Sequence, residues 1–506
     1  MADVVTRTLS ADHITPVRAY AALRAQSPGL SSYLLESVVP GERWGRYSIL
    51  GYRARSEGKY APGGNAIRAL GQKLQQLDVP EGLAARFSQA LVGYIAYDAV
   101  HAVHGVPPWP NEGDLARVMR DTTVVVFDNL KQTLSIAGRT KNAVDRCAWE
   151  MTHGPEFTPL LPPDPSAMPE LLAVSMDDAM FMSNVERAKE YIRAGDVFQV
   201  VLARTFTSPM GGVDPFDIYR ALRVLSPSPY LYFLDFAETP MAAGLAIAGA
   251  SPETMVRLED GRVTLRPIAG TRPRGATPEE DARLAEELLM DPKERAEHVM
   301  LIDLARNDVG RVCETGSVEL TEIMSVERYS HVMHIVSEIN GRKRANLSTG
   351  DVVEATFPAG TLTGAPKVRA TEIIRELETG PRGIYGGAIG YLGADGNVDL
   401  AIAIRTVVAV NGELHVTAGA GIVEGSVPEL EAQETRNKAL AALAAIAAAQ
   451  LAAVAREEAS AAKARAAEKA ASAEALPHAT ASKEASVLPT SSDPTEAAAK
   501  TNALDP

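Results

Sequence analysis

The sequence predicts an α+β fold in which strands are grouped in hairpins and long helices interrupt them. Turn dipeptides separate strand-like apolar runs at three points, namely Asp260-Gly261, Asp395-Gly396 and Asn411-Gly412. The last two divide the runs 384–392, 398–410 and 413–417, which predicts a three-stranded antiparallel meander. Helical periodicity over residues 177–194 interrupts the hairpins, and this pattern favours α+β over alternating βαβ units with a parallel sheet.

The composition is typical of a soluble globular protein over most of the chain. With 506 residues, 46% of them hydrophobic, the chain can bury a large core in one large domain or in two to three smaller ones. A formal net charge of −14 without a basic block argues against binding to nucleic acid or to an anionic membrane. Residues 1–15 lack the pattern of a signal peptide, and the apolar run 439–449 is too short to span a bilayer.

Only two cysteines are present, Cys147 and Cys313, and neither lies in a C-x-x-C motif. Their separation predicts neither a disulfide framework nor a thiolate metal site. A reducing compartment such as the cytoplasm fits this usage.

Four regions are expected in chain order. Residues 1–150 form a β-rich region with strand-like runs at 32–38, 91–97 and 122–127. Residues 151–170 are a linker, because closely spaced prolines oppose both helix and strand. Residues 171–445 hold the helices and hairpins described above, including a strand after Gly195. Residues 446–506 form an Ala-rich helical segment and then a disordered tail.

The Ala-rich helix is predicted from an apolar stripe. Leu440, Leu443, Ala447, Leu451 and Val454 share one face at helical spacing. A helix that begins at Glu429 is therefore expected to continue through this segment, and disorder is expected only after Pro477.

A helix over 291–308 is predicted to place two carboxylates and an imidazole on one face. Asp291 is a candidate N-cap with Pro292 at the first helical position. Glu294, Glu297 and His298 then stand at i, i+3 and i+4. Two interpretations are open: Glu294 completes a capping box while the other two are solvated, or the three groups serve a hard cation or a proton transfer.

A second acid pair at the same spacing, Glu431 and Glu434, favours the metal interpretation. By itself this pair also suits an exposed helix with an ion pair between Glu434 and Lys438. Two such pairs on two helices could close around Mg2+, which prefers oxygen ligands and keeps positions for water and substrate.

Three glycine-rich loops at 267–275, 358–367 and 417–422 are candidates for binding an anion. Glycine lets backbone N–H groups approach a carboxylate, and threonine adds a hydroxyl donor, although each loop alone also suits an ordinary turn. Arg405 ends an apolar strand, where an arginine requires an anionic partner such as a carboxylate.

These motifs together resemble the chorismate-utilising enzymes, and specifically the large synthase subunits of anthranilate synthases. The resemblance runs from about residue 30 to 445 and is carried by the segments 34–37, 195–199, 228–230, 251–253, 267–271, 293–298, 360–367, 404–405, 418–421 and 431–438. It implies two large antiparallel sheets packed as a sandwich and surrounded by helices. The implied activity is a lyase reaction that converts chorismate and ammonia to anthranilate and pyruvate.

The resemblance also implies roles for individual residues. Glu297 and Glu434 are expected to hold Mg2+, supported by Glu294 and Glu431. The expected catalytic residues are Glu253 as general acid, His298 for proton transfer or for orienting Glu297, Gln199 and Thr361. The expected substrate-binding residues are Gly270, Thr271, Tyr385, Arg405, Gly419, Ala420, Gly421 and Lys438.

Two positions separate this chain from sister enzymes of the resembled family. Isochorismate and salicylate synthases carry a lysine where Gln199 stands, and a neutral amide is a poor general base for activating water. Aminodeoxychorismate synthases commonly carry a lysine nucleophile where Ala269 stands. An aminodeoxychorismate synthase component and a non-catalytic tryptophan-binding regulatory protein remain the alternatives.

Partners and regulation follow from the same resemblance. No cysteine-centred glutaminase segment follows residue 445, so a separate glutamine amidotransferase subunit is expected to supply ammonia in a hetero-oligomer. Tryptophan is expected to inhibit by binding Ser37, Pro229, Tyr230 and Leu231. Taken singly, the two segments also suit a buried strand with a satisfied serine and a proline turn.

Overall fold

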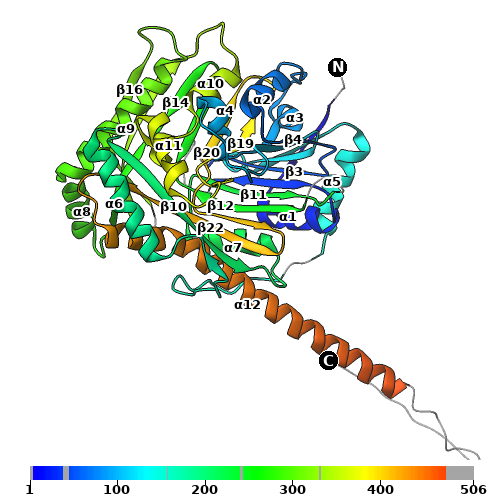
Figure 1. Ribbon diagram of the computed structural model, residues 1–506. Helices are drawn as coiled ribbons and strands as arrows, with labels where there is room; N and C mark the ends of the chain where they lie inside the picture. Colours follow the sequence, from blue (N-terminus) through cyan, green and yellow to red (C-terminus); the bar gives the residue numbers. More distant parts are fainter. Residues whose placement is uncertain (1–3, 38–44, 156–157, 240–242, 330–331, 475–506) are drawn as a thin grey trace, which may run out of the picture. The chain divides into compact units, whose positions relative to one another are not determined.

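The computed structural model describes residues 4–37, 45–155, 158–239, 243–329 and 332–474 (Figure 1). Within these residues the strands form two antiparallel sheets of 12 and 10 strands, with helices packed on them. The predicted α+β fold with two large antiparallel sheets is therefore confirmed. Met1–Val454 form one compact unit, which contains both sheets, and Ala455–Pro506 form a second.

The strands of the 12-stranded sheet are, in spatial order, β1 (Val5–Ser10), β8 (Thr133–Gly138), β7 (Thr123–Asp128), β3 (Tyr47–Tyr52), β2 (Ser32–Glu36), β11 (Tyr230–Phe236), β12 (Leu245–Ser251), β21 (Thr406–Val410), β22 (Glu413–Ile422), β10 (Gln199–Pro209) and β18 (Gly364–Ala365), with β9 (Ala173–Val174) also paired to β10. Those of the 10-stranded sheet are β15 (Ile268–Pro273), β17 (Val332–Arg342), β14 (Arg262–Leu265), β13 (Thr254–Glu259), β20 (Val398–Ile402), β19 (Ala388–Leu392), β5 (Leu91–Ile95), β6 (Ala116–Arg120) and β4 (Ser56–Tyr60), with β16 (Glu319–Arg328) also paired to β17.

The helices are α1 (Pro16–Ala25), α2 (Ala66–Leu74), α3 (Leu83–Gln89), α4 (Val100–His104), α5 (Lys141–His153), α6 (Asp178–Ala194), α7 (Pro215–Leu225), α8 (Pro278–Met290), α9 (Pro292–Gly310), α10 (Thr349–Thr356), α11 (Lys367–Leu377) and α12 (Pro428–Glu474), with short 3₁₀ turns η1 (Tyr97–Ala99) and η2 (Gly360–Leu362). Helix α6 and the hairpin of β13 and β14 match the sequence predictions. In the described part of the predicted linker, α5 ends at His153 and no helix or strand follows before β9.

Strand β11 shows how the layers form, because it buries side chains on both faces. Leu231 and Phe233 pack into a cluster with residues of α1 and α7, whereas Tyr232 and Leu234 pack between the two sheets. Alternate residues of a strand point to opposite faces, so this continuous apolar run places β11 in the interior. Figure 1 shows β3, β11 and β12 in one layer, with α7 on one side of them and β19 and β20 on the other.

Strands from the region 1–150 are built into both sheets. In the 12-stranded sheet β2 pairs with β11, with Phe233 opposite Leu34. In the 10-stranded sheet β5 pairs with β19, with Gly390 opposite Gly93. Residues 1–150 are therefore not a domain of their own, and the predicted boundary at 151–170 divides the sequence without dividing the sheets.

The predicted three-stranded meander is wrong. The run 398–410 forms two strands, β20 and β21, which belong to different sheets. Strand β20 ends at Ile402, and Arg405, directly before β21, has φ of 49°, a left-handed conformation. The chain therefore crosses from one sheet to the other at this residue, and each strand forms a hairpin with a different neighbour, β19 and β22 respectively.

Helix α12 begins at Pro428 and continues to Glu474, as predicted, but only part of the predicted stripe is buried. Leu443 and Ala447 of the stripe are buried, whereas Leu451 and Val454 are 68% and 53% exposed. Ala439, Ala442, Ala445 and Ala449 pack against the 12-stranded sheet because their small side chains allow a close approach. By length and mean hydropathy α12 could cross a membrane, but half of the relevant window is buried within the protein, as in core helices of soluble proteins. Disorder predicted after Pro477 falls outside the described residues.

Gly249 of β12 tests the cross-strand packing. It lies opposite Tyr232, and a Cβ at this position would lie 2.1 Å from the tyrosine ring. We expect Gly249→Ala to lower the free energy of unfolding by about 1–3 kcal/mol, since overpacking forces the ring to move. Gly113→Ala is the control, because a Cβ there meets open space. Equal urea midpoints for the two variants would contradict this packing.

Candidate active site

Helix α9 brings Glu294, Glu297 and His298 to the same region. Asp291 caps the helix and accepts hydrogen bonds from the backbone N–H groups of Lys293 at 2.9 Å and Glu294 at 3.2 Å. This confirms the predicted start of the helix. The Glu294 carboxylate does not close a capping box; it lies 3.4 Å from the guanidinium of Arg272 on β15. That carboxylate is therefore directed toward the glycine-rich segment 267–275, which was expected to be a loop but forms strand β15 over most of its length.

His298 is completely buried beneath this face. Its Nε2 lies 2.8 Å from the hydroxyl of Ser337 on β17, and burial lowers the pKa of the imidazole to about 4. The ring is therefore neutral at physiological pH. Its Nδ1 has no hydrogen-bond partner among the described residues. His298 thus fixes α9 to β17 at the position that follows Glu297 in the helix.

Helix α12 presents the second acid pair. Glu434 forms an ion pair with Lys438 at 2.6 Å, and the Lys438 ammonium also donates to the Gly419 carbonyl at 3.1 Å. The ion pair considered from the sequence is therefore present. It lies against β22 and not on a free helix face, since Lys438 reaches the glycine segment of that strand.

The two acid pairs face each other. Burial raises the pKa of Glu297, and the negative charges of Glu294 and Glu434 raise it further. Burial and the charge of Glu434 likewise raise the pKa of Glu431. Carboxylate oxygens are the ligand type that suits a hard divalent cation such as Mg2+, but among the described residues no three of these four carboxylates bring their oxygens within 4.8 Å of one another.

Gln199 connects this acid cluster to the 12-stranded sheet. Its Nε2 donates to Glu297 Oε1 at 3.4 Å, and its Oε1 has no hydrogen-bond partner among the described residues. A Cβ at Gly421 would lie 2.5 Å from Gln199 Nε2. Glycine at position 421 therefore leaves room for the amide in its present orientation beside Glu297.

Glu253 forms the opposite part of the site. It lies between β12 and β13 and accepts a hydrogen bond from the Thr361 hydroxyl at 2.9 Å. Burial raises the pKa of Glu253 to about 7, although Thr361, Arg405 and Lys438 each act to lower it. Burial also lowers the pKa of Arg405, which faces Glu253. This carboxyl can therefore carry a proton near neutral pH.

Gly270 and Thr271 are held by a histidine that the sequence did not indicate. His334 Nδ1 lies 2.9 Å from the Gly270 carbonyl and 3.1 Å from the Thr271 hydroxyl. Gly270 has φ of 63°, and a Cβ there would lie 3.1 Å from Glu294 Oε2. Since β15 pairs with β17 and places Thr271 opposite His334, only the strand register identifies this contact.

Tyr385 and the segment 419–421 complete the site. A Cβ at Gly419 would lie 2.8 Å from the Tyr385 hydroxyl, which places that hydroxyl against the backbone of β22. Ala420 lies opposite Leu202 in the β10–β22 ladder. The structure thus brings together the predicted catalytic, substrate and metal residues on α9, α12, β22 and the loops beside them.

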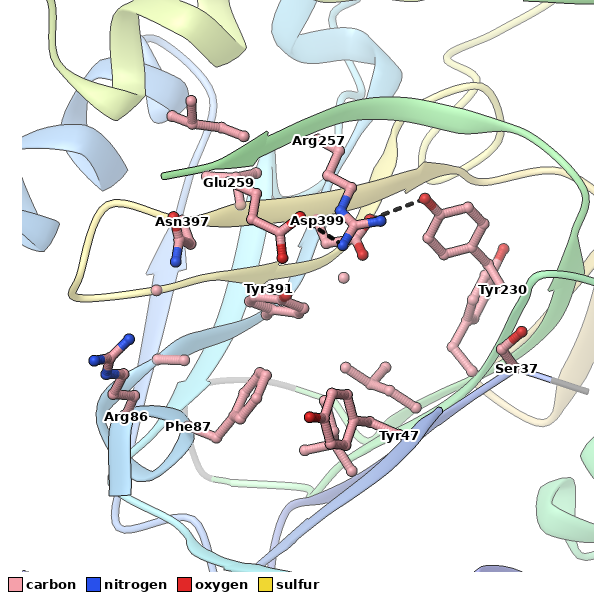
Figure 2. Close-up of a pocket in the computed structure, with 18 of the residues that line it drawn as sticks. Ser37, Tyr47, Arg86, Phe87, Tyr230, Arg257, Glu259, Tyr391, Asn397 and Asp399 are labelled. Carbon is pink, nitrogen blue, oxygen red and sulfur yellow. Dashed lines mark hydrogen bonds and ion pairs between the residues drawn. The ribbon is translucent and has the colours of Figure 1, made fainter. Parts of the chain in front are cut away.

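The predicted inhibitor residues line a separate pocket of about 480 Å³ (Figure 2). Ser37, Pro229, Tyr230 and Leu231 all line it, and Figure 2 shows Ser37 and Tyr230 close together on one side. Tyr230 donates to the carboxylate of Asp399 at 2.9 Å, and burial raises the pKa of Asp399 to about 6. The Ser37 hydroxyl is buried without a hydrogen-bond partner among the described residues. Sequence reasoning missed Asp399, as well as the pocket's aromatic residues Tyr47, Phe87 and Tyr391.

A third cluster, Asp98, His101 and Glu112, also escaped sequence reasoning. Its potential ligand atoms lie within 4.8 Å of one another. The backbone N–H groups of Arg382 and Gly383 donate to Asp98 at 3.2 and 2.7 Å, and Glu112 accepts from the Trp109 N–H at 2.9 Å and contacts His101. Because protein groups already satisfy these atoms, the cluster has a structural role and connects α4 to the loop that leads to Tyr385.

Comparisons with known proteins agree with this arrangement. Residues 46–444 match the family model of the chorismate binding enzymes. The chain therefore belongs to the chorismate-binding enzyme family.

Within that family, relatives named anthranilate synthase component 1 are similar to this chain. The protein of Pseudomonas putida is 45% identical over 476 residues, which cover 87% of this chain and 94% of the relative. That of Pseudomonas aeruginosa is 44% identical over 477 residues, with the same coverage of both chains. The crystal structure of anthranilate synthase component I from Streptococcus pneumoniae TIGR4 superposes with a TM-score of 0.70 at 35% identity and covers 86% of this chain and 99% of that one. The resemblance stated from the sequence motifs is confirmed.

The raised pKa of Glu253 predicts a pH-dependent stability. Because folding raises this pKa from 4.5 to about 7, the stabilisation of the protonated carboxyl is complete below about pH 4.5 and is lost as the pH rises through 7. A neutral amide does not titrate, so Glu253→Gln should become progressively more stable relative to the parent protein between pH 5 and 8. Urea unfolding at several pH values measures this difference. Glu190→Gln, at an exposed position of α6, is the control, and an equal pH trend in both variants would contradict a buried, protonated Glu253.

Proposed function

We propose that this chain is the synthase component of an anthranilate synthase, which converts chorismate and ammonia to anthranilate and pyruvate. The observation that carries the proposal is the family membership, with relatives named anthranilate synthase component 1 that match over 94% of their length. Gln199 stands where the sister enzymes that add water carry a lysine. Ala269 stands where the sister enzymes that form a 4-amino product carry a lysine.

The chemistry suits the arrangement around Glu253. Ammonia adds to C2 of the ring while the C4 hydroxyl leaves, and a hydroxyl is a poor leaving group unless an acid protonates it. A carboxyl with a pKa of about 7 holds this proton at neutral pH. Thr361 fixes the carboxyl by its hydrogen bond. Glu253 therefore acts as the general acid.

The carboxylates of chorismate require hydrogen-bond donors on the wall of the site opposite Glu253. The amides of residues 419–421, the Tyr385 hydroxyl and the Arg405 guanidinium form one group of donors beside β22, and Thr271 and Gly270 form another beside β15. Arg405 is buried, so its charge needs an anionic partner. Lys438 lies between the Gly419 carbonyl and Glu434 and adds positive charge to the same wall.

Mg2+ is the proposed cofactor, held by Glu297 and Glu434 with support from Glu294 and Glu431. When bound, it neutralises the substrate's ring carboxylate and the charge that shifts during elimination. Between its two possible roles, the buried position of His298 favours orientation of Glu297 over removal of the C2 proton. Its hydrogen bond to Ser337 holds α9 in place, as supporting groups commonly do at metal sites.

A partner component is implied by the designation of the relatives as component 1. We propose that this partner is a glutamine amidotransferase that supplies ammonia in a hetero-oligomer located in the cytoplasm. Cys147 and Cys313 are both buried, and burial raises the pKa of each thiol, so neither is suited to act as a glutaminase nucleophile.

Turnover of the isolated chain is the main test. With chorismate, ammonium and Mg2+ we expect anthranilate, followed by its fluorescence, and we expect no product with glutamine as nitrogen source or with a chelator. Glu253→Gln should lower kcat by about 10²–10⁴-fold, as loss of a general acid does. Glu190→Gln is the control with an unchanged rate.

Other outcomes would identify the rival functions. If 4-amino-4-deoxychorismate is the main product, the chain is an aminodeoxychorismate synthase component. If no product forms with ammonium and Mg2+ while tryptophan still binds, the chain is a non-catalytic regulatory protein. Loss of turnover in Glu297→Ala and Glu434→Ala excludes the second rival.

We further propose that tryptophan inhibits the enzyme from the pocket of Figure 2. The unpartnered Ser37 hydroxyl offers a hydrogen bond, Asp399 offers a carboxylate to an ammonium group, and Tyr391 and Phe87 offer aromatic walls. Tyr230 also contacts the Thr254 hydroxyl at 2.9 Å, and Thr254 directly follows Glu253. Strand β13, which contributes residues to the pocket, therefore begins directly after Glu253, and any coupling between the two sites must be reciprocal.

Ser37→Ala tests the inhibitor site. Removing one hydrogen bond should raise the tryptophan concentration for half-inhibition by about 2- to 10-fold while the uninhibited rate stays the same. Inhibition curves at fixed chorismate measure the effect, with Ser183→Ala on the exposed face of α6 as control. Lost catalysis together with unchanged tryptophan affinity would show that Ser37 is only part of the core.

A further inference from the structure

One buried guanidinium, that of Arg382, joins three segments of the active site. Its side chain is 3% exposed and forms an ion pair at 2.6 Å with Glu378, which is 5% exposed. It also donates to the backbone carbonyls of Leu362 at 2.6 Å and Val201 at 2.8 Å. Its central carbon lies 4.5 Å from the ring centre of Tyr97 and 5.8 Å from that of Tyr385.

Each backbone acceptor lies next to a residue of the site. Leu362 follows Thr361, whose hydroxyl binds Glu253. Val201 lies opposite Gly421 in the β10–β22 ladder. Its N–H also donates to the Thr363 carbonyl at 2.9 Å, so β10 and the loop 360–363 meet at the guanidinium.

We propose that Arg382 is a positioning residue that sets the Thr361 hydroxyl against Glu253 and fixes the register of the glycine segment of β22. The effect of Arg382 on catalysis rests on the proposed function, whereas the effect of Arg382 on Glu253 does not. Arg382 lies behind Tyr385 and acts through the Leu362 and Val201 carbonyls.

The geometry requires arginine at this position. A guanidinium offers five N–H groups in a rigid plane, so it can bind a carboxylate and two carbonyls at once. A lysine could keep the charge and the pair with Glu378, but one ammonium cannot reach both carbonyls in the same arrangement. A buried carbonyl that loses its donor moves to find another, and the Leu362 carbonyl moves Thr361 with it.

The backbone at position 382 is held independently of the side chain. Asp98 accepts the N–H groups of Arg382 and Gly383 at 3.2 and 2.7 Å. The Gly383 carbonyl in turn accepts the Tyr97 N–H at 2.8 Å. Replacement of the Arg382 side chain therefore removes the guanidinium contacts while these backbone contacts remain.

Arg117 provides a matched control. Its side chain is also 3% exposed and pairs with a glutamate, Glu57, at 3.0 Å. It donates to the Ala243 and Ala237 carbonyls at 3.0 and 3.1 Å and lies 4.7 Å from the ring centre of Phe236. None of these acceptors adjoins a residue of the active site. Arg117→Lys therefore reports the general effect of a buried arginine-to-lysine change.

The first measurement is the pKa of Glu253, read from ¹³C-labelled carboxyl groups and assigned by the signal lost in Glu253→Gln. The Thr361 hydrogen bond lowers this pKa, so Arg382→Lys should raise it, whereas Arg117→Lys should not. Arg405 and Lys438, the charged groups that face Glu253, are the same in all variants. Thr361→Val should raise the pKa as well, and adding Arg382→Lys to it should produce no further rise.

The second measurement is turnover. We expect Arg382→Lys to lower kcat about 10- to 100-fold, as small misplacements of catalytic groups do, and to move the alkaline limb of the pH–rate profile to higher pH. Arg117→Lys should leave both unchanged. If Arg382→Lys does not fold, Glu378→Gln, which weakens the hold on the guanidinium, should change both readouts in the same direction.

The proposal is overturned if Arg382→Lys, or Glu378→Gln in its place, leaves the Glu253 pKa where Arg117→Lys leaves it. A parent protein without turnover would reject the proposed function alone, because the carboxyl pKa remains measurable. A fall in kcat without a change in the Glu253 pKa would show that Arg382 acts elsewhere, and would also overturn the proposal.

Discussion

The ladder between β10 and β22 is the interaction on which the active site depends. It runs from Val200 opposite Ile422 to Pro209 opposite Glu413, so it places Gln199 at one end and the segment 419–421 beside it. Arg204 of β10 extends the ladder to α12, because its guanidinium donates to the Thr435 hydroxyl at 2.9 Å and the Ala432 carbonyl at 3.0 Å. These acceptors adjoin Glu434 and Glu431. A single strand therefore fixes the amide, the glycines and one of the two acid pairs.

Local signals in the sequence predicted the elements that carry the acids. The cap at Asp291, the i, i+3 spacing on α9 and α12, and the hairpin turns were all correct, since each depends on residues within one or two turns.

The errors in the predicted fold have a physical cause as well. A short apolar run has the same pattern in either sheet, so nothing in 398–410 marked the change of sheet at Arg405. In α12 the predicted stripe included Leu451 and Val454, which are exposed, while most of the residues that pack closely are small alanines.

The site residues that belong to sequence motifs were predicted. The residues that reach the site only through long-range pairing were missed. His334, Asp98 and Arg382 reach their partners across many residues of sequence, and no local spacing identifies those contacts. The charge state of Glu253 likewise depends on burial between two sheets, which only the packed structure provides. The acids could therefore be identified from the sequence, while the groups that orient them required the structure.

The interleaving of early and late strands has a consequence for synthesis of the protein. Strand β5 leaves the ribosome about 300 residues before its partner β19, which at roughly 5–20 residues per second is a wait on the order of 15–60 s. During this time β5 has only β6 paired beside it, and the later members of its packing cluster, such as Ile389 and Ala401, have not been made. Chains in this state expose strand edges to one another. The 10-stranded sheet can therefore be completed only after β19 has been made, and until then the nascent N-terminal half exposes the strand edge of β5.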